Sequence, residues 1–78
     1  MKDLVEYIAT SLVDDPTQVQ VSQMRRGSQV VLKLQVAKDD MGRVIGKNGK
    51  VANAIRILLR VAAVQEGKRA VLDIIEPE

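Results

Sequence analysis

The residues that bear most directly on chemistry are two glycines, Gly46 and Gly49, which enclose two polar residues, Lys47 and Asn48. Glycine lets a backbone turn tightly and lets the backbone of a ligand come close. A helical pattern follows at once, so main-chain N–H groups at a helix N-terminus would lie beside Lys47 and Lys50, which suits phosphate binding. This G-x-x-G layout clamps the backbone of about four nucleotides of single-stranded nucleic acid.

Spacing excludes two other glycine motifs. Three residues separate Gly42 from Gly46, whereas a P-loop needs four, and Asn48 stands where a P-loop has the Ser or Thr that holds a metal. The dinucleotide-binding pattern G-x-G-x-x-G is absent as well. The glycine pair therefore favours a clamp on a nucleic-acid backbone.

The basic residues are concentrated in the half of the chain that contains the glycines. Residues 43–69 contain seven cations and one anion, a net charge of +6, whereas residues 1–42 contain five cations and six anions, a net charge of −1. A cluster of this kind is typical of phosphate binding, although a solvated helix face accounts for some of these charges.

The composition removes most catalytic chemistry. The chain has no Cys and no His, which excludes thiol catalysis, disulfides, zinc fingers and imidazole acid–base chemistry. Asp14-Asp15 and Asp39-Asp40 are carboxylate pairs, but a turn and a helix cap explain them more simply than a metal or acid–base site. We therefore predict a protein that is not an enzyme and that uses no cofactor or metal.

The N-terminal half predicts one helix and a β-hairpin. Apolar residues recur at helical spacing from Leu4 to Val13, and Pro16 disfavours helix just before it. Residues 17–24 alternate as in a half-buried strand, 25–28 favour a turn, and 30–36 alternate again. The acidic residues near the start do not fit a signal peptide, and no apolar run approaches a membrane span, so we expect a cytoplasmic protein.

The C-terminal half predicts two helices and a strand. Asp39 is the expected cap of a short helix that ends at Gly46, and a long helix extends from Gly49 to Glu66. Residues 70–75 form the last strand, which a crossover through two helices makes parallel to the second strand. The prediction is an α+β fold of order α-β-β-α-α-β, with a three-stranded mixed sheet and helices on one face.

Apolar residues precede and follow the glycines in the segment Val44-Ile45-Gly46-Lys47-Asn48-Gly49-Lys50-Val51. This segment resembles the V-I-G-x-x-G core of a KH domain. The order of elements resembles the type II form, and the resemblance covers essentially the whole chain as one domain, residues 1–78, with the β-α-α-β core at about 29–76. The best match is the family of small bacterial single-KH proteins of the KhpA type.

The resemblance implies single-stranded RNA binding through three groups of residues. The loop would hold the sugar–phosphate chain, the bases would lie in an apolar groove, and cations would form a rim. A chain whose only aromatic residue is Tyr7 does not fit RRM or OB folds, which stack bases on aromatic rings. The predicted site comprises the loop Gly46, Lys47, Asn48 and Gly49, the groove Val44, Ile45, Val51, Ala52 and Ile55, and the rim Arg43, Lys50 and Arg56.

The long helix has more apolar surface than one sheet face can bury in so small a domain. The excess would either meet another subunit or lie under the N-terminal helix, and the sequence leaves both open. The family resemblance implies a homodimer or a heterodimer with a larger KH-containing protein of the KhpB type. An alternative function is therefore a protein-interaction scaffold, for a partner or the ribosome, with little RNA affinity.

The resemblance also implies a cellular setting. Proteins of this family are RNA chaperones or post-transcriptional regulators, and in some bacteria they are tied to cell elongation and cell-wall homeostasis. Single-stranded DNA stays open as a ligand, because the loop grips phosphate and no identifiable residue reads the 2′-OH.

Overall fold

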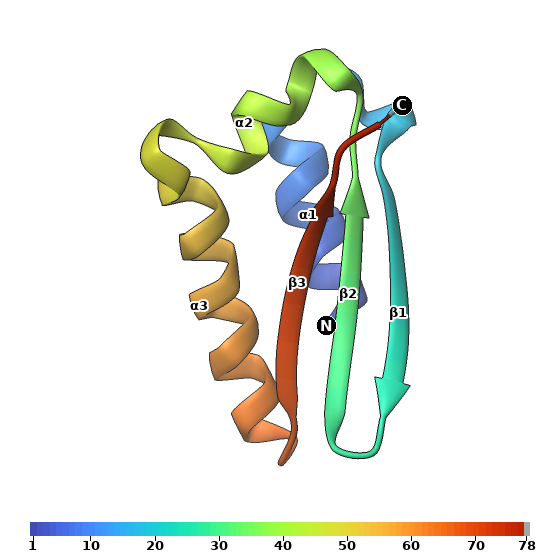
Figure 1. The fold of residues 1–78 in the computed structure, drawn as a ribbon, viewed down its shortest axis with the longest axis vertical. Coiled ribbons are helices and arrows are strands. Elements are labelled where there is room, and N and C mark those ends of the chain that lie inside the picture. Colours follow the sequence, from blue (N-terminus) through green and yellow to red (C-terminus); the bar gives the residue numbers. More distant parts are fainter. Residues whose placement is uncertain (78) are drawn as a thin grey trace.

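A computed structural model describes residues 1–77 of the chain. Its order of helices and strands confirms the predicted α-β-β-α-α-β arrangement (Figure 1). Three single turns of 3-10 helix, η1, η2 and η3, lie in the connections. The elements are α1 (Lys2–Leu12), η1 (Pro16–Gln18), β1 (Gln20–Arg26), β2 (Gln29–Gln35), η2 (Lys38–Asp40), α2 (Met41–Ile45), η3 (Lys47–Gly49), α3 (Lys50–Gln65) and β3 (Arg69–Ile75).

The three strands form one mixed sheet in the order β1-β2-β3. β1 pairs with β2 in antiparallel register, and β2 pairs with β3 in parallel register, as the two-helix crossover predicts. In Figure 1, α1 lies behind the sheet and α3 runs beside β3. Within residues 1–77, no helix covers the opposite face of the sheet (Figure 1).

The hydrophobic core lies between the sheet and the helices. Alternation along β2 buries every second side chain, which is the pattern of a strand with one covered face. α3 buries residues spaced three or four apart, because only one stripe of an α-helix can face a sheet. The core comprises Val5, Ala9, Val30, Leu32, Leu34, Val36, Val44, Ala52, Ile55, Leu59, Ala63 and Leu72.

The first strand begins and ends later than the sequence predicts. Pro16–Gln18 forms one turn of 3-10 helix, because Pro16 fits the first helical position and the Asp15 carboxylate accepts a hydrogen bond from the N–H of Thr17. β1 then continues through Arg26, which pairs with Gln29. The hairpin turn is therefore only Gly27 and Ser28, whereas the prediction placed it at residues 25–28.

The predicted cap at Asp39 is wrong. Asp39 is exposed, and the connection before α2 is the turn η2, which has no side-chain cap. The neighbouring Asp40 is buried, and its carboxylate oxygens accept hydrogen bonds from the main-chain N–H groups of Asp14 and Asp15, each at 3.1 Å. Asp40 thus joins the connection after α1 to the start of α2. Within residues 1–77, no helix is long and apolar enough to cross a membrane.

Candidate nucleic-acid interface

The loop between α2 and α3 depends on glycine at its first position. Gly46 has φ 76° and ψ 171°, a conformation that essentially only glycine adopts. A Cβ atom there would lie 2.4 Å from Cγ2 of Val51, which is far inside van der Waals contact. Both the backbone and the packing of α3 against the loop therefore require Gly46.

The second half of the loop reverses the chain through two left-handed residues. Asn48 has φ 58° and ψ 26°, and Gly49 has φ 75° and ψ 13°. Asn is one of the few side chains that tolerate this region. The N–H of Gly49 donates to the carbonyl of Gly46 at 3.1 Å, which closes one tight turn directly before α3.

Two main-chain donors of the loop are free within residues 1–77. Lys47 and Asn48 are the first two residues of the turn η3, so their N–H groups have no acceptor within that helix. Neither group donates to a main-chain acceptor in the turns and loops of residues 1–77. Both side chains are exposed, as is Lys50, and neither lysine forms an ion pair in this part of the chain. Free N–H groups at a helix N-terminus beside two cations form an anion-binding arrangement.

The five predicted groove residues do not lie at equal depth. Ile45 is 36% exposed and Val51 is half-buried, so both present apolar surface beside the loop. Val44, Ala52 and Ile55 are at most 3% exposed and belong to the core. The structure therefore places Ile45 and Val51 at the surface, where a base could contact them. It places Val44, Ala52 and Ile55 in the core, below that surface.

The predicted rim residue Arg43 is engaged within the protein. Its guanidinium lies 2.9 Å from the Asp14 carboxylate and 3.3 Å from the buried Asp40 carboxylate. Together with the bonds from Asp40 to the chain after α1, these ion pairs fix α2 just before the loop. Patterns along the chain do not reveal this link, because Asp14 and Asp15 lie 25–29 residues before Asp40 and Arg43.

The predicted rim residue Arg56 crosses from α3 to the edge strand β3. Its Nε and one terminal nitrogen donate to the carbonyl of Leu72 at 3.4 and 3.3 Å, and the other terminal nitrogen donates to Oδ1 of Asn53 at 3.5 Å. Arg56 is half-buried. The three rim cations thus differ in their availability to a ligand. Lys50 is free in the described part of the chain, whereas Arg43 and Arg56 bind other residues of the protein.

A stripe of apolar side chains on α3 stays exposed. The stripe comprises Ile57, Leu58, Val61 and Val64, which are 51–69% exposed. α1 contacts β1 and α3 and buries Val5 and Ala9 in the core, but the side chains of the stripe stay exposed, so α1 does not cover them. Of the two alternatives that the sequence left open, coverage by the N-terminal helix is therefore wrong.

The order of elements, the mixed sheet and the G-x-x-G turn between α2 and α3 define a type II KH domain. The family described as KhpA/KhpB, KH domain, matches residues 2–74 of this chain. The chain therefore belongs to the KhpA/KhpB KH-domain family, as its resemblance predicted.

Relatives of similar length support this assignment. The RNA-binding protein KhpA of Clostridium acetobutylicum is 53% identical over 75 residues, covering 96% of this chain and all of that protein. The RNA-binding protein KhpA of Bacillus subtilis is 38% identical over 76 residues, covering 97% of this chain and 94% of that protein.

Solved structures support the fold. Aquifex aeolicus Era, in the crystal structure of its Y63A variant bound to GDP and AlF4−, matches with a TM-score of 0.60 and 19% identity. Era in complex with MgGDPNP and nucleotides 1506–1542 of 16S ribosomal RNA matches with a TM-score of 0.55 and 19% identity. Each match covers 94% of this chain but 28% of the Era chain, so the likeness concerns one part of Era.

Proposed function

We propose that this protein binds single-stranded RNA through the loop from Gly46 to Gly49, without catalysis. The observation that carries the proposal is the loop itself, with two main-chain N–H groups free in the described structure and an exposed Lys47 at the N-terminus of α3. The name RNA-binding protein KhpA, which its relatives bear, supports the same ligand.

Binding would proceed by phosphate contact at the loop and base contact beside it. The N–H groups of Lys47 and Asn48 would donate to phosphate oxygens, and the Lys47 ammonium would neutralise the charge. Bases would lie on Ile45 and Val51, with β3 forming the far side of the groove. Because four nucleotides offer few contacts, we expect weak binding with little sequence preference.

The test is fluorescence anisotropy of a 5′-labelled ten-nucleotide oligouridine, U10, titrated with the parent and with Lys47→Asp/Asn48→Asp. We expect at least a tenfold loss of affinity, because two carboxylates would face phosphate. The fold should survive, since both side chains are exposed and Asp, like Asn, tolerates the left-handed region. Circular dichroism checks the fold.

A charge-matched control separates local contact from net charge. Lys2→Asp/Ser22→Asp also changes the net charge by −3, at exposed positions on α1 and β1. This control should bind within about threefold of the parent, since it is far from the loop. Equal losses in both variants, or parent-like binding by the loop variant, would overturn the clamp. A matching titration with single-stranded DNA decides between the two nucleic acids.

We also propose that the exposed stripe on α3 joins this chain to a second KH-containing chain, either another copy or a KhpB-type partner. Four large apolar side chains that are more than half exposed favour burial against another protein. Dimerisation would raise RNA avidity without new base contacts. Analytical ultracentrifugation of the parent and of Leu58→Asp/Val61→Asp tests the homodimer, and a monomeric parent at high concentration would reject it.

Tight binding to a partner protein with no measurable RNA affinity would instead favour the scaffold function. For the cell, we propose a cytoplasmic RNA chaperone or post-transcriptional regulator, linked through its family to cell elongation and cell-wall homeostasis. Crosslinking this protein to RNA in cells, with the Lys47→Asp/Asn48→Asp variant as the control, tests that role. Equal RNA recovery from both proteins would contradict it.

A further inference from the structure

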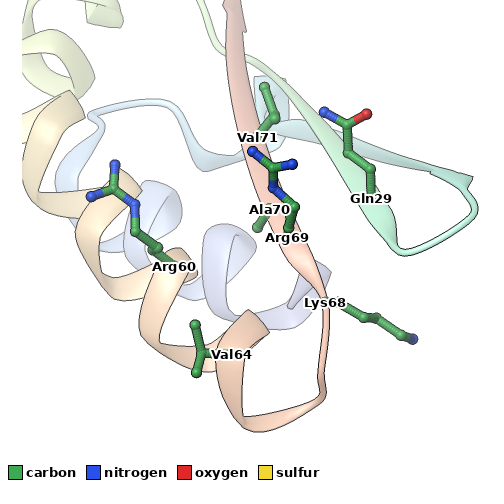
Figure 2. Close-up of a pocket in the computed structure, with 7 residues that line it drawn as sticks. All are labelled: Gln29, Arg60, Val64, Lys68, Arg69, Ala70 and Val71. Carbon is green, nitrogen blue, oxygen red and sulfur yellow. The ribbon is translucent and has the colours of Figure 1, made fainter.

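A basic hollow lies between α3 and β3 at the end of α3 opposite the G-x-x-G loop. It has a volume of about 430 Å³ (Figure 2). Its charged lining residues are all cations, Arg60, Lys68 and Arg69. The remaining lining is the Gln29 amide and the small apolar side chains of Val64, Ala70 and Val71.

The cations of the hollow are available to an outside ligand. None of the ion pairs within residues 1–77 involves Arg60, Lys68 or Arg69. Arg60 and Arg69 are exposed, and Figure 2 shows them on opposite walls, Arg60 from α3 and Arg69 from β3. The side chain of Lys68 points outward from the hollow (Figure 2). Two arginines that line one hollow suit a phosphate, which each guanidinium can bind through paired N–H groups.

The polar side of α3 connects this hollow with the loop. Lys50, Asn53, Arg56 and Arg60 fall within about a third of the helix circumference at 100° per residue. Arg56 on this side contacts the edge strand β3, so the polar side of α3 faces β3. The ten helical steps from Lys50 to Arg60 span about 15 Å. A strand held at the loop and laid along β3 would therefore reach the hollow.

We propose that the hollow is a second phosphate site, which holds the RNA strand where it continues beyond the nucleotides at the G-x-x-G loop. Arg60 and Arg69 bind its phosphodiester groups, and Ala70 and Val71 provide an apolar floor for a base. This inference rests on the proposed function, and it makes the preferred ligand longer than the four nucleotides of one loop. The two arginines belong to different elements, and only the fold places them beside the same hollow.

The test compares a short and a long oligouridine, U4 and U10, with the parent and with Arg60→Gln/Arg69→Gln. Binding is followed by amide chemical shifts of the 15N-labelled protein. A longer strand can bind in more positions along its length, which raises its affinity for every variant. The test therefore compares the ratio of U10 affinity to U4 affinity between the parent and the variant. We expect the variant to bind U4 like the parent and to lose about tenfold for U10. The slope of its log affinity for U10 against log salt concentration should decrease in magnitude by about 1.4, the value for two phosphate contacts to a single strand.

A matched control removes two cations elsewhere. Lys2→Gln/Arg25→Gln neutralises two exposed side chains outside the hollow and should keep the parent ratio of U10 to U4 affinity. In the parent, U10 but not U4 should shift the amide signals of residues 69–71. In the variant, these shifts should be lost.

The outcomes distinguish the two proposals. If the parent binds neither oligonucleotide, the proposed function fails and this inference fails with it. If the parent binds both but Arg60→Gln/Arg69→Gln keeps the parent ratio, only the second site is overturned. An equal loss for U4 and U10 in that variant would also overturn it, because the arginines would then act through net charge alone. Binding of an acidic peptide, but not U10, at residues 69–71 would assign the hollow to a protein partner.

Discussion

Two turns of this chain place a glycine beside basic residues, and they are built differently. The β1–β2 turn has Gly27 at φ 60° next to Arg25 and Arg26, and a Cβ added at Gly27 would meet nothing within 4 Å. The G-x-x-G loop has Gly46 pressed against Val51. The two turns lie toward opposite ends of the molecule (Figure 1).

The difference lies in what surrounds each turn. The hairpin turn continues directly into a paired strand, since Arg26 pairs with Gln29, so it serves only to reverse the chain. The loop leaves the N–H groups of Lys47 and Asn48 free in the described structure and directs them beside a helix N-terminus. Glycine and positive charge therefore do not define a phosphate site by themselves; a rigid support and free donors are also required.

The largest expected effect comes from Gly46→Ala. Alanine at the φ and ψ of Gly46, which essentially only glycine adopts, costs about 1–3 kcal/mol. The overlap with Val51 adds about 1–3 kcal/mol for overpacking. Urea unfolding should show the loss in the free energy of unfolding. Gly27→Ala is the matched control, and it should cost only the backbone contribution of about 1–2 kcal/mol. Equal losses in the two variants would mean that the loop is no better supported than the hairpin turn.

Asp40→Ala tests the support behind the loop. The substitution removes the acceptor of two main-chain N–H groups and one partner of Arg43, so we expect a loss of about 2 kcal/mol in the free energy of unfolding. Asp39→Ala removes an exposed neighbouring carboxylate and should change it by less than about 0.5 kcal/mol. Urea unfolding measures both variants, and similar free energies of unfolding would show that Asp40 does not support the loop.

Single charge deletions compare the two turns as binding sites. Lys47→Gln should lower the slope of log affinity for U10 against log salt by about 0.7, the contribution of one phosphate contact to a single strand. Arg25→Gln removes the same charge beside Gly27 and should leave the slope unchanged. Anisotropy titrations between 50 and 200 mM salt measure both slopes. A smaller slope in the Arg25 variant would show that the loop has no special role.

Local patterns in the sequence were enough to predict the fold. Alternation in β2 and helical spacing in α3 are local signals, and the two-helix crossover fixed the parallel pairing of β2 with β3. The boundaries of β1 were wrong, because the Asp15 side chain and Pro16 stabilise a 3-10 turn where alternation alone favoured strand. Side-chain hydrogen bonds of this kind compete with a strand without changing its apolar pattern.

The environment of the candidate site was less predictable than its loop. Helical spacing does not separate a groove residue such as Val51 from a core residue such as Ile55, because both lie near the sheet side of α3. The contacts of Asp40 and Arg43 with the chain after α1 join residues that are 25–29 positions apart. Arg60 of α3 and Arg69 of β3 line one hollow although they belong to different elements. Such contacts follow from the tertiary fold, which a pattern along the chain does not encode.

The smallest expected effect comes from Asn48→Gly, which separates main-chain from side-chain recognition at the loop. Glycine keeps the left-handed backbone of Asn48 and its free N–H but removes the amide side chain. If the main chain carries the phosphate contact, U10 affinity should stay within about twofold of the parent, a change of less than about 0.5 kcal/mol. Anisotropy titration measures the affinity, and urea unfolding confirms that the loop is intact. A tenfold loss of affinity with unchanged stability would instead assign the contact to the Asn48 side chain.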